Sequence, residues 1–315
     1  MIYIVLIVLF IIFLSAYIMG DLFVEQALNM KKIRDKGNKS LQNNKLTQDY
    51  PPYEPGIYCQ DMSKWVLNDS NYRNVSIIND GLNLNAVYIE NPASHRFVLF
   101  FHGYSSKAVG YGSFLHKFYL EGFNVLAPDM RAHGSSDGTY TTMGYFERLD
   151  YLKWIDYILK QDPMAEIVLY GISMGAACAM FTCGEKLPPN VICCIEDCGF
   201  SSVWEELRHE CASSLHIPAF PVLFFANVVS RVKLHFDMHK ADTAAFLCRA
   251  EIPVMFIHGK KDAFVPFEML QKNYDACRSE KTMLVMENAA HGRCSSAEPV
   301  RYWKEVFEFI RKYSK

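Results

Sequence analysis

Hydrophobic and polar residues divide the chain into three parts. The first 19 residues, MIYIVLIVLFIIFLSAYIM, carry no charge and one weakly polar residue, Ser15. As a helix they would be about 29 Å long, the thickness of the hydrocarbon core of a bilayer, which predicts a transmembrane anchor over residues 1–19. Residues 20–60 are amphipathic at first and then polar, with Pro and Gly at their end. We expect them to form a stalk, either a spacer or an arm draped on the domain.

Residues 61–315 alternate between short apolar runs and amphipathic stretches. Strands are expected near residues 97–102, 124–128, 167–170, 191–196, 254–258 and 283–287, and helices near 111–121, 144–160, 174–186, 266–277 and 298–313. This alternation predicts an α/β fold, with a mostly parallel central sheet and helices on both faces. The strands are apolar almost throughout, as expected for a parallel sheet buried on both sides. Ahead of them, residues 65–91 alternate around an Asn-Asp-Gly turn at 79–81 and predict a β-hairpin.

One stretch interrupts this alternation. Almost sixty residues separate the strands at 191–196 and 254–258, many more than a crossover helix needs. We place an insertion at about 203–250, and it contains the aromatic and apolar patch IPAFPVLFFANVV at 217–229. Two interpretations stay open for this patch. It lines an acyl-binding pocket as part of a lid, or it is the packed face of a helical pair.

The sequence Gly-Ile-Ser-Met-Gly at 171–175 lies between an expected strand and an expected helix. A Gly-x-Ser-x-Gly motif in this context is typical of the nucleophile elbow, in which a strained turn exposes the serine hydroxyl. Gly171 and Gly175 would leave room where strand and helix nearly touch. Ser173 is therefore the expected nucleophile.

Downstream, an acid and a base follow in the order that this motif requires. Asp262 lies in the loop after the strand at 254–258, and His291 follows the last strand. Both are at the carboxyl ends of strands, where open α/β sheets bind ligands. We expect Asp262 and His291 to complete a triad with Ser173. His102 and His258 precede glycines and are expected to brace loops.

Two backbone N–H groups are expected to form the oxyanion hole. One belongs to Met174, directly after the nucleophile, and the other to Tyr104, in the loop after the strand at 97–102. A second loop, Asp-Met-Arg-Ala-His-Gly-Ser-Ser at 129–136, follows the strand at 124–128. We expect this loop to lie beside the site.

Taken together, the motifs resemble the α/β-hydrolase superfamily, and specifically its serine esterase/lipase and serine-aminopeptidase-like branch with an N-terminal membrane anchor. The resemblance covers roughly residues 75–313 and implies that the insertion is a helical cap. Some members place the acid at the end of the strand before the cap, so Glu196 and Asp197 remain alternatives to Asp262. The resemblance also suggests a structural pair of Asp129 and Arg131, and it places Ala132 where the superfamily often has Gly.

Composition narrows the function further. A net charge of −2 gives no basis for nucleic-acid binding. The sequence has no Gly-rich phosphate loop, HExxH motif or CxxC pair, so we expect neither a cofactor nor a metal. Ten cysteines without disulfide-like spacing suit a reducing compartment.

The N-terminal segment could also be a cleaved signal peptide, but it lacks a basic start, a short apolar core and an A-x-A-like end. We therefore expect a retained single-pass anchor. Five basic residues follow it within the next twenty positions and none precedes it, which places the catalytic domain on the cytoplasmic side by the positive-inside rule. They are Lys31, Lys32, Arg34, Lys36 and Lys39.

We interpret the chain as a membrane-anchored serine hydrolase that cleaves small-molecule or lipid-like carboxylic esters. Amide or peptide hydrolysis and thioester hydrolysis are the nearest alternatives, because the same groups serve all three reactions. A non-catalytic, membrane-tethered interaction protein on a hydrolase scaffold is the alternative from another class.

Overall fold

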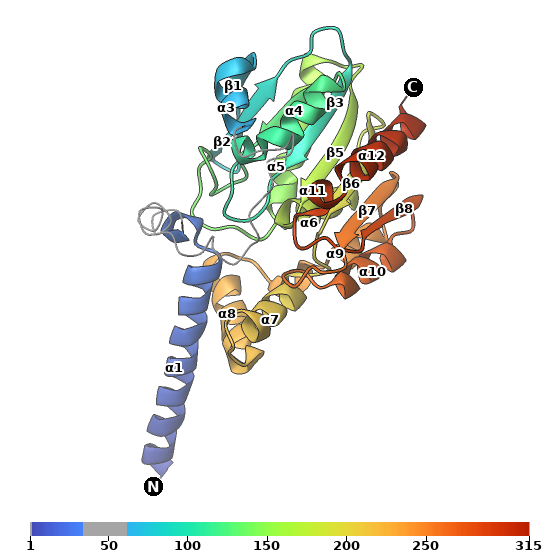
Figure 1. The fold of residues 1–315 in the computed structure, drawn as a ribbon. Coiled ribbons are helices and arrows are strands. Elements are labelled where there is room, and N and C mark those ends of the chain that lie inside the picture. The colour runs from blue at the N-terminus through green and yellow to red at the C-terminus, as the bar shows by residue number, and fades with distance from the viewer. Residues whose placement is uncertain (1, 34–61, 315) are drawn as a thin grey trace.

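The computed structural model describes residues 2–33 and 62–314, and the rest of the expected stalk lies outside these ranges. In the described residues, eight strands form a single sheet in the order β1-β2-β4-β3-β5-β6-β7-β8 (Figure 1). They are β1 (Tyr72–Asn79), β2 (Leu82–Ile89), β3 (Arg96–Phe101), β4 (Asn124–Pro128), β5 (Glu166–Ile172), β6 (Val191–Asp197), β7 (Val254–Gly259) and β8 (Lys281–Met286). β2 runs antiparallel to both its neighbours, and β3 to β8 are mutually parallel. The predicted mostly parallel sheet is confirmed.

The predicted hairpin is also present, with narrower limits. Asp80 and Gly81 connect β1 to β2 with φ angles of 54° and 73°. Two positive φ angles in a two-residue loop are the geometry that Asp-Gly favours between twisted strands. Residues Trp65–Asp69, which the alternation assigned to the hairpin, instead form a helical turn, η1, after the short α3 (Met62–Lys64).

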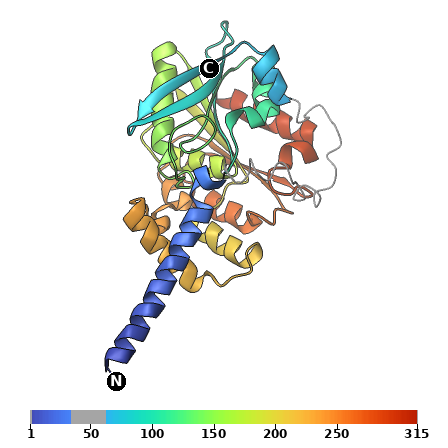
Figure 2. The same ribbon diagram turned by 90° about the vertical axis from the view of Figure 1, so that its left-hand side faces the viewer.

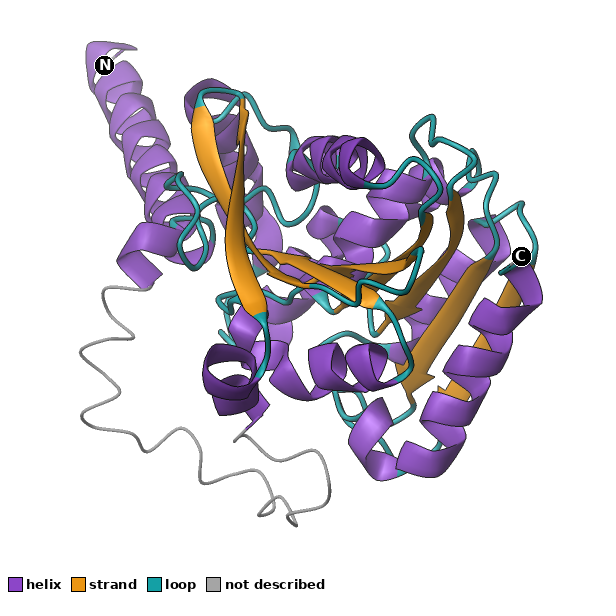
Figure 3. Ribbon diagram, turned by 90° about the horizontal axis from the view of Figure 1, so that it is seen from above, coloured by secondary structure: helices purple, strands orange, loops and turns teal. Residues whose placement is uncertain are grey.

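Helices cover both faces of the sheet, as Figure 3 shows from above. On one face, α4 (Gly112–Leu120), α11 (Cys294–Ala297) and α12 (Pro299–Tyr313) share a core with the sheet. The core of the other face includes residues of α5 (Glu147–Gln161), α6 (Met174–Cys183) and α10 (Phe267–Ala276). The short 3-10 helix η2 (Ala108–Tyr111) leads into α4. Burial on both sides explains why strands such as β3 and β7 are mostly apolar.

The insertion after β6 is helical, as expected. It contains α7 (Val203–Ser213), α8 (Ala219–Lys233), the 3-10 helix η3 (Met238–Lys240) and α9 (Thr243–Leu247). α7 and α8 project from the domain beside the N-terminal helix (Figure 1). Leu223, Ala226 and Val229 are buried in the core, whereas Phe220 and Phe224 are 76% and 52% exposed. The aromatic patch is therefore not wholly core, since two of its three phenylalanines are exposed.

The N-terminal helix α1 (Ile2–Ala27) extends eight residues beyond the expected end of the anchor at residue 19. In the described residues it is the one helix long and apolar enough to cross a membrane, by length and composition. Its first part projects away from the domain (Figure 2). Val24, Leu28 and Met30 are buried in the domain. The described start of the expected stalk thus packs against the domain as far as residue 30, as in the alternative of a draped arm.

Candidate active site

Ser173 occupies a strained turn between β5 and α6. Its φ of 58° and ψ of −122° lie in a region that L-residues rarely adopt. The two neighbouring glycines are required because there is no room for a side chain at either position. A Cβ on Gly175 would lie 2.0 Å from the carbonyl oxygen of Phe101, and one on Gly171 would lie 2.3 Å from the carbonyl oxygen of Gly175. The sequence motif thus encodes a close approach of strand and helix that only glycine permits.

The structure brings Ser173, Asp262 and His291 into one hydrogen-bonded chain. His291 Nε2 lies 2.8 Å from Ser173 Oγ, and its Nδ1 lies 2.7 Å from Asp262 Oδ2. A carboxylate only accepts hydrogen bonds, so Nδ1 carries the proton and Nε2 accepts the hydrogen bond from the serine hydroxyl. The three residues follow β5, β7 and β8, so parallel strand ends place them at one edge of the sheet.

The environment of Asp262 keeps its carboxylate ionised. Burial disfavours the charge, but hydrogen bonds from His258 and His291 outweigh it and lower the pKa of Asp262 to about 2. The backbone N–H groups of Phe264 and Val265 donate to Oδ1 at 3.0 and 2.8 Å. His258 also donates to the Val265 carbonyl at 2.9 Å. It therefore stabilises the loop that contains Asp262 (the acid loop), the role that the sequence suggested for it.

The two alternative acids point elsewhere. Asp197 Oδ2 accepts a hydrogen bond of 2.7 Å from the hydroxyl of Tyr302, on α12. Glu196 Oε2 accepts one of 2.9 Å from the N–H of Gly199. Burial raises the pKa of both carboxyls, that of Glu196 to about 8. Neither side chain is hydrogen bonded to His291, so among the three carboxyls the structure pairs the histidine with Asp262.

Met174 and the loop that carries Tyr104, the two expected sources of oxyanion donors, lie beside Ser173. Met174 is the first residue of α6, so its N–H has no partner within the helix and lies at the positive end of the helix dipole. The loop that carries Tyr104 is close as well, since a Cβ on Gly103 would be 3.6 Å from the Cβ of Ser173. His102 braces this loop, because its Nδ1 donates to the Gly103 carbonyl at 2.8 Å and its Nε2 accepts from the Met130 N–H at 2.9 Å. Burial and the nearby His133 lower the pKa of His102 to about 4, which keeps it neutral for this role.

The end of α1 also reaches this loop, a contact that no pattern in the sequence predicted. The hydroxyl of Tyr104 donates a hydrogen bond of 2.7 Å to the carbonyl of Ala27. The next residue, Leu28, accepts a hydrogen bond of 2.9 Å from the N–H of Thr141. Thr141 Oγ1 lies 3.7 Å from the sulfur of Met174. The last turn of the N-terminal helix is therefore in contact with two segments that border the site.

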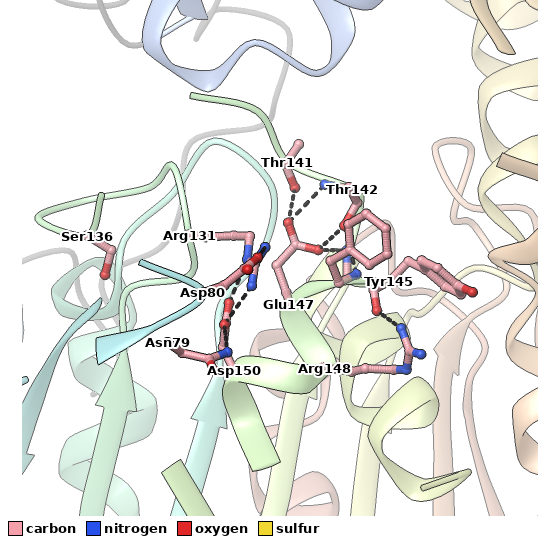
Figure 4. A network of polar contacts seen from close by, with 12 residues as sticks. Asn79, Asp80, Arg131, Ser136, Thr141, Thr142, Tyr145, Glu147, Arg148 and Asp150 are labelled. Atoms are coloured by element: carbon pink, nitrogen blue, oxygen red, sulfur yellow. Dashed lines mark hydrogen bonds and ion pairs between the residues drawn. The ribbon is translucent and has the colours of Figure 1, made fainter. Parts of the chain in front are cut away.

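A buried polar network holds the loop that contains Thr141 (Figure 4). The Glu147 carboxylate accepts hydrogen bonds from the hydroxyls of Thr141 and Thr142 at 2.9 and 2.6 Å. Close by, Arg131 binds both oxygens of Asp150 at 2.7 Å. Bidentate pairs of this kind are among the stronger polar contacts in proteins.

This network corrects one sequence-based expectation. Asp129 does not pair with Arg131, which binds Asp150 instead. Asp129 accepts hydrogen bonds of 2.8 Å from the N–H groups of Ala108 and Ser135, and so organises its own loop. Ala132, where the resembling superfamily often has glycine, has a φ of 66° in the left-handed region.

In the described residues, one group of side chains has donor atoms close enough to share a metal ion. Cys198, Asp262 and His291 offer atoms within 4.8 Å of one another. Burial raises the pKa of the Cys198 thiol well above its usual range, so the thiolate that binds metals is disfavoured. Asp262 and His291 are already hydrogen bonded to each other. The donor set therefore suits a metal poorly.

Comparisons with known proteins agree with this architecture. Residues 92–250, half of the chain, match the family described as Serine aminopeptidase, S33. The chain is 26% identical over 231 residues to the uncharacterized protein YqkD of Bacillus subtilis, across 73% of this chain and 76% of that one. It is 24% identical over 200 residues to the lysophosphatidylserine lipase ABHD12 of Danio rerio, across 61% of this chain and 50% of that one.

Solved structures show the same fold. The Pyrococcus furiosus esterase Pf2001 superposes with a TM-score of 0.63 at 24% identity, across 84% of this chain and 98% of that one. The mouse alpha/beta hydrolase domain-containing protein 10 superposes with a TM-score of 0.57 at 19% identity, across 77% of this chain and 100% of that one. The expectation of an α/β-hydrolase fold is confirmed.

Proposed function

The chain belongs to the serine aminopeptidase S33 family of α/β-hydrolases, and we propose that it is a membrane-anchored serine hydrolase that cleaves carboxylic esters. As an α/β-hydrolase it is of the esterase, lipase and peptidase type. The observation that carries the proposal is the hydrogen-bonded chain from Ser173 through His291 to Asp262.

In the proposed reaction, Ser173 Oγ attacks the acyl carbonyl while His291 Nε2 takes its proton. The charged imidazolium that forms is stabilised by Asp262, which is ionised at neutral pH because its pKa is about 2. The N–H groups of Tyr104 and Met174 would hold the oxyanion of the tetrahedral intermediate. His291 then gives its proton to the leaving alcohol, and an acyl-enzyme remains. Water, deprotonated by the same histidine, attacks this acyl-enzyme and releases the acid.

The direct test is Ser173→Ala. The loss of a triad serine costs on the order of 10⁶ in kcat, so ester hydrolysis and fluorophosphonate labelling should both disappear while the fold is retained. Ser76→Ala, on the exposed side of β1, is the matched control and should keep full activity. If Ser173→Ala keeps more than a small percentage of wild-type activity at equal purity, the proposed nucleophile is wrong. If the wild-type protein neither labels nor hydrolyses any substrate, the chain is an interaction protein on a hydrolase scaffold.

We favour esters because one relative is described as a lipase and one structural neighbour as an esterase. The family description, in contrast, names an aminopeptidase, which keeps amide hydrolysis as the second candidate. A panel of ester, thioester and amide substrates that share the same acyl group separates these three activities. The ester proposal requires the highest kcat/KM for the oxygen ester, and a higher value for the amide would reverse it.

The proposal includes an anchor formed by the apolar part of α1 and a catalytic domain on the cytoplasmic side. It is supported by the length of the apolar segment and by the basic residues that follow it. The protein should stay in the membrane fraction after carbonate washing. In intact cells, an added protease should leave the domain uncut. Cleavage from outside would place the domain on the other side, and a mature N-terminus beyond residue 19 would replace the anchor with a signal peptide.

A further inference from the structure

The cap helix α8 packs tightly along α1. A Cβ on Gly20 would lie 2.5 Å from the backbone carbonyl carbon of Phe225, so the two helices touch at this point. Ala16, one turn earlier, is also buried. Small residues four apart on one face allow close backbone approach, as in helix pairs within membranes. Further toward the N-terminus, the rings of Phe13 and Phe225 meet edge to face with centroids 5.5 Å apart.

These contacts give the depth of the cap relative to the apolar segment. A cluster of charges marks the polar end of α1, where Lys233 pairs with Asp21 and Glu25. Phe13 lies eight residues before Asp21, which is about 12 Å along the helix axis. The ring of Phe225 reaches this level, while its backbone contacts Gly20 and the residues before it in α8 lie further from the charged end. The first turns of α8 therefore lie alongside a part of α1 that would be inside the hydrocarbon core.

The outer surface of the cap at this depth is mostly apolar, with the exposed His216 as its one basic side chain. Leu215, Phe220 and Phe224 are 52%, 76% and 52% exposed. They belong to the turn between α7 and α8 and to the start of α8, the part of the domain that points toward the N-terminal end of α1 (Figure 1). The stretch from Cys211 to Ser230 contains no Asp, Glu, Lys or Arg. Exposing these apolar side chains to water is unfavourable, whereas contact with lipid acyl chains is not.

We propose that the tip of the cap, from Leu215 to Phe225, is immersed in the bilayer beside α1. The protein would then contact lipid through two elements, an anchoring helix and the cap that borders its active-site edge. The cap is linked to the acid loop, since His209 Nε2 on α7 donates to the Ala263 carbonyl at 3.0 Å. The substrate class that follows is an ester with its acyl chain in the membrane, delivered from the lipid phase. This inference rests on the proposed anchored ester hydrolase.

The test measures immersion directly with the full chain in phosphatidylcholine vesicles, with and without bromine on the acyl chains. A tryptophan is placed in the tip as Phe224→Trp or, separately, as Phe220→Trp, and the native four tryptophans set the background. The matched control is Ile78→Trp, 79% exposed in the β1 strand. The tip variants should add a fluorescence component that brominated lipid quenches, and the control should add one that it does not.

Equal, unquenched components in all three variants would overturn the proposal. So would an unquenched tip together with cross-links between tips of two chains, since the surface would then bind a second copy. This readout needs no hydrolysis, so it is independent of Ser173→Ala, which tests the proposed function itself.

A second arm compares substrates. Phe220→Asp should lower hydrolysis of a long-chain ester in vesicles, relative to a water-soluble acetyl ester, by about tenfold, because a charge in the tip opposes its immersion. Ile78→Asp should leave this ratio unchanged. A ratio that is the same for both variants would exclude delivery from the lipid phase.

Discussion

The hydroxyl of Tyr104 donates a hydrogen bond of 2.7 Å to the carbonyl of Ala27, which joins the loop after β3 to the last turn of α1. Because the N–H of Tyr104 is a proposed oxyanion donor, the N-terminal helix contacts a residue of the proposed catalytic apparatus. The tyrosine is partly buried, and this burial raises its pKa well above the usual range. The phenol therefore stays protonated and remains a donor across the physiological pH range.

Tyr104→Phe tests whether this contact positions the loop. The substitution removes the hydroxyl and leaves a partly buried carbonyl without its partner, which costs about 1–3 kcal/mol. We expect kcat to fall several-fold with little change in KM, because an oxyanion donor acts mainly in the transition state. Steady-state kinetics on a soluble ester measure both constants. Tyr72→Phe in the edge strand β1 is the control, and an equal effect there would argue against a positioning role.

Truncation separates the membrane part of α1 from its packed part. A protein that starts at residue 20 keeps Val24, Leu28 and Met30 and should be folded and active. One that starts at residue 34 loses these three buried side chains, each worth about 1.5–3 kcal/mol. The combined loss is comparable with the whole stability of a typical domain. Urea unfolding of the two proteins measures the difference, and equal midpoints would show that residues 20–33 contribute nothing to stability.

The assignment of the acid predicts a ranking of two variants. Asp262→Asn should lower kcat by about 10⁴, because an amide at this position holds His291 in the wrong tautomer. Asp197→Asn should cost far less, since an amide oxygen can still accept the hydrogen bond from Tyr302. Kinetics with one ester substrate, together with circular dichroism to check folding, provide the comparison. The reverse ranking would move the acid to the end of β6.

The buried Glu196 predicts a pH-dependent stability. Burial raises its pKa from the ordinary value of 4.5 to about 8, so between these values the folded protein holds a proton that the unfolded chain has released. The stability that the protonated Glu196 contributes is fully present below pH 4.5 and is lost as pH rises to about 8. Over this range the free energy of unfolding falls by at most about 1.4 kcal/mol per pH unit.

Urea unfolding at several pH values between 5 and 8 tests this. The free energy of unfolding should fall with rising pH in the wild-type protein and fall much less in Glu196→Gln, which can still accept the hydrogen bond from Gly199. Glu308→Gln, on the exposed side of α12, should behave like the wild type. Parallel slopes in all three proteins would show that Glu196 is not the group responsible.

Several features could be predicted from the sequence because their causes are local. The alternation of apolar runs and amphipathic stretches reports which segments are buried on two sides or on one, and it located every strand from β3 to β8. Gly171 and Gly175 are required because the strand and the helix approach so closely that a Cβ at either position would overlap the backbone. The order of Ser173, Asp262 and His291 along parallel strands placed them at one edge of the sheet, since parallel strands end on the same side.

Other features depended on contacts between segments far apart in the chain. Asp262, Glu196 and Asp197 all follow or end parallel strands, and only the direction of each side chain decides which one meets His291. For Asp197 that direction is set by Tyr302, which is 105 residues away on α12. Arg131 likewise pairs with Asp150 and not with Asp129, which is closer in the sequence.

The role of residues 20–30 and of the cap tip was also decided by the tertiary structure. A helical periodicity does not say what an apolar face will touch, because burial is a property of the packed neighbours. Val24 and Leu28 are core residues because the domain closes around them, while Phe220 and Phe224 stay exposed because α8 buries its opposite face. The sequence by itself determined which edge of the sheet carries the proposed catalytic residues and their order along the chain. Only the packing of α1 against α8 and Tyr104 decided that the anchor and the proposed active site are joined.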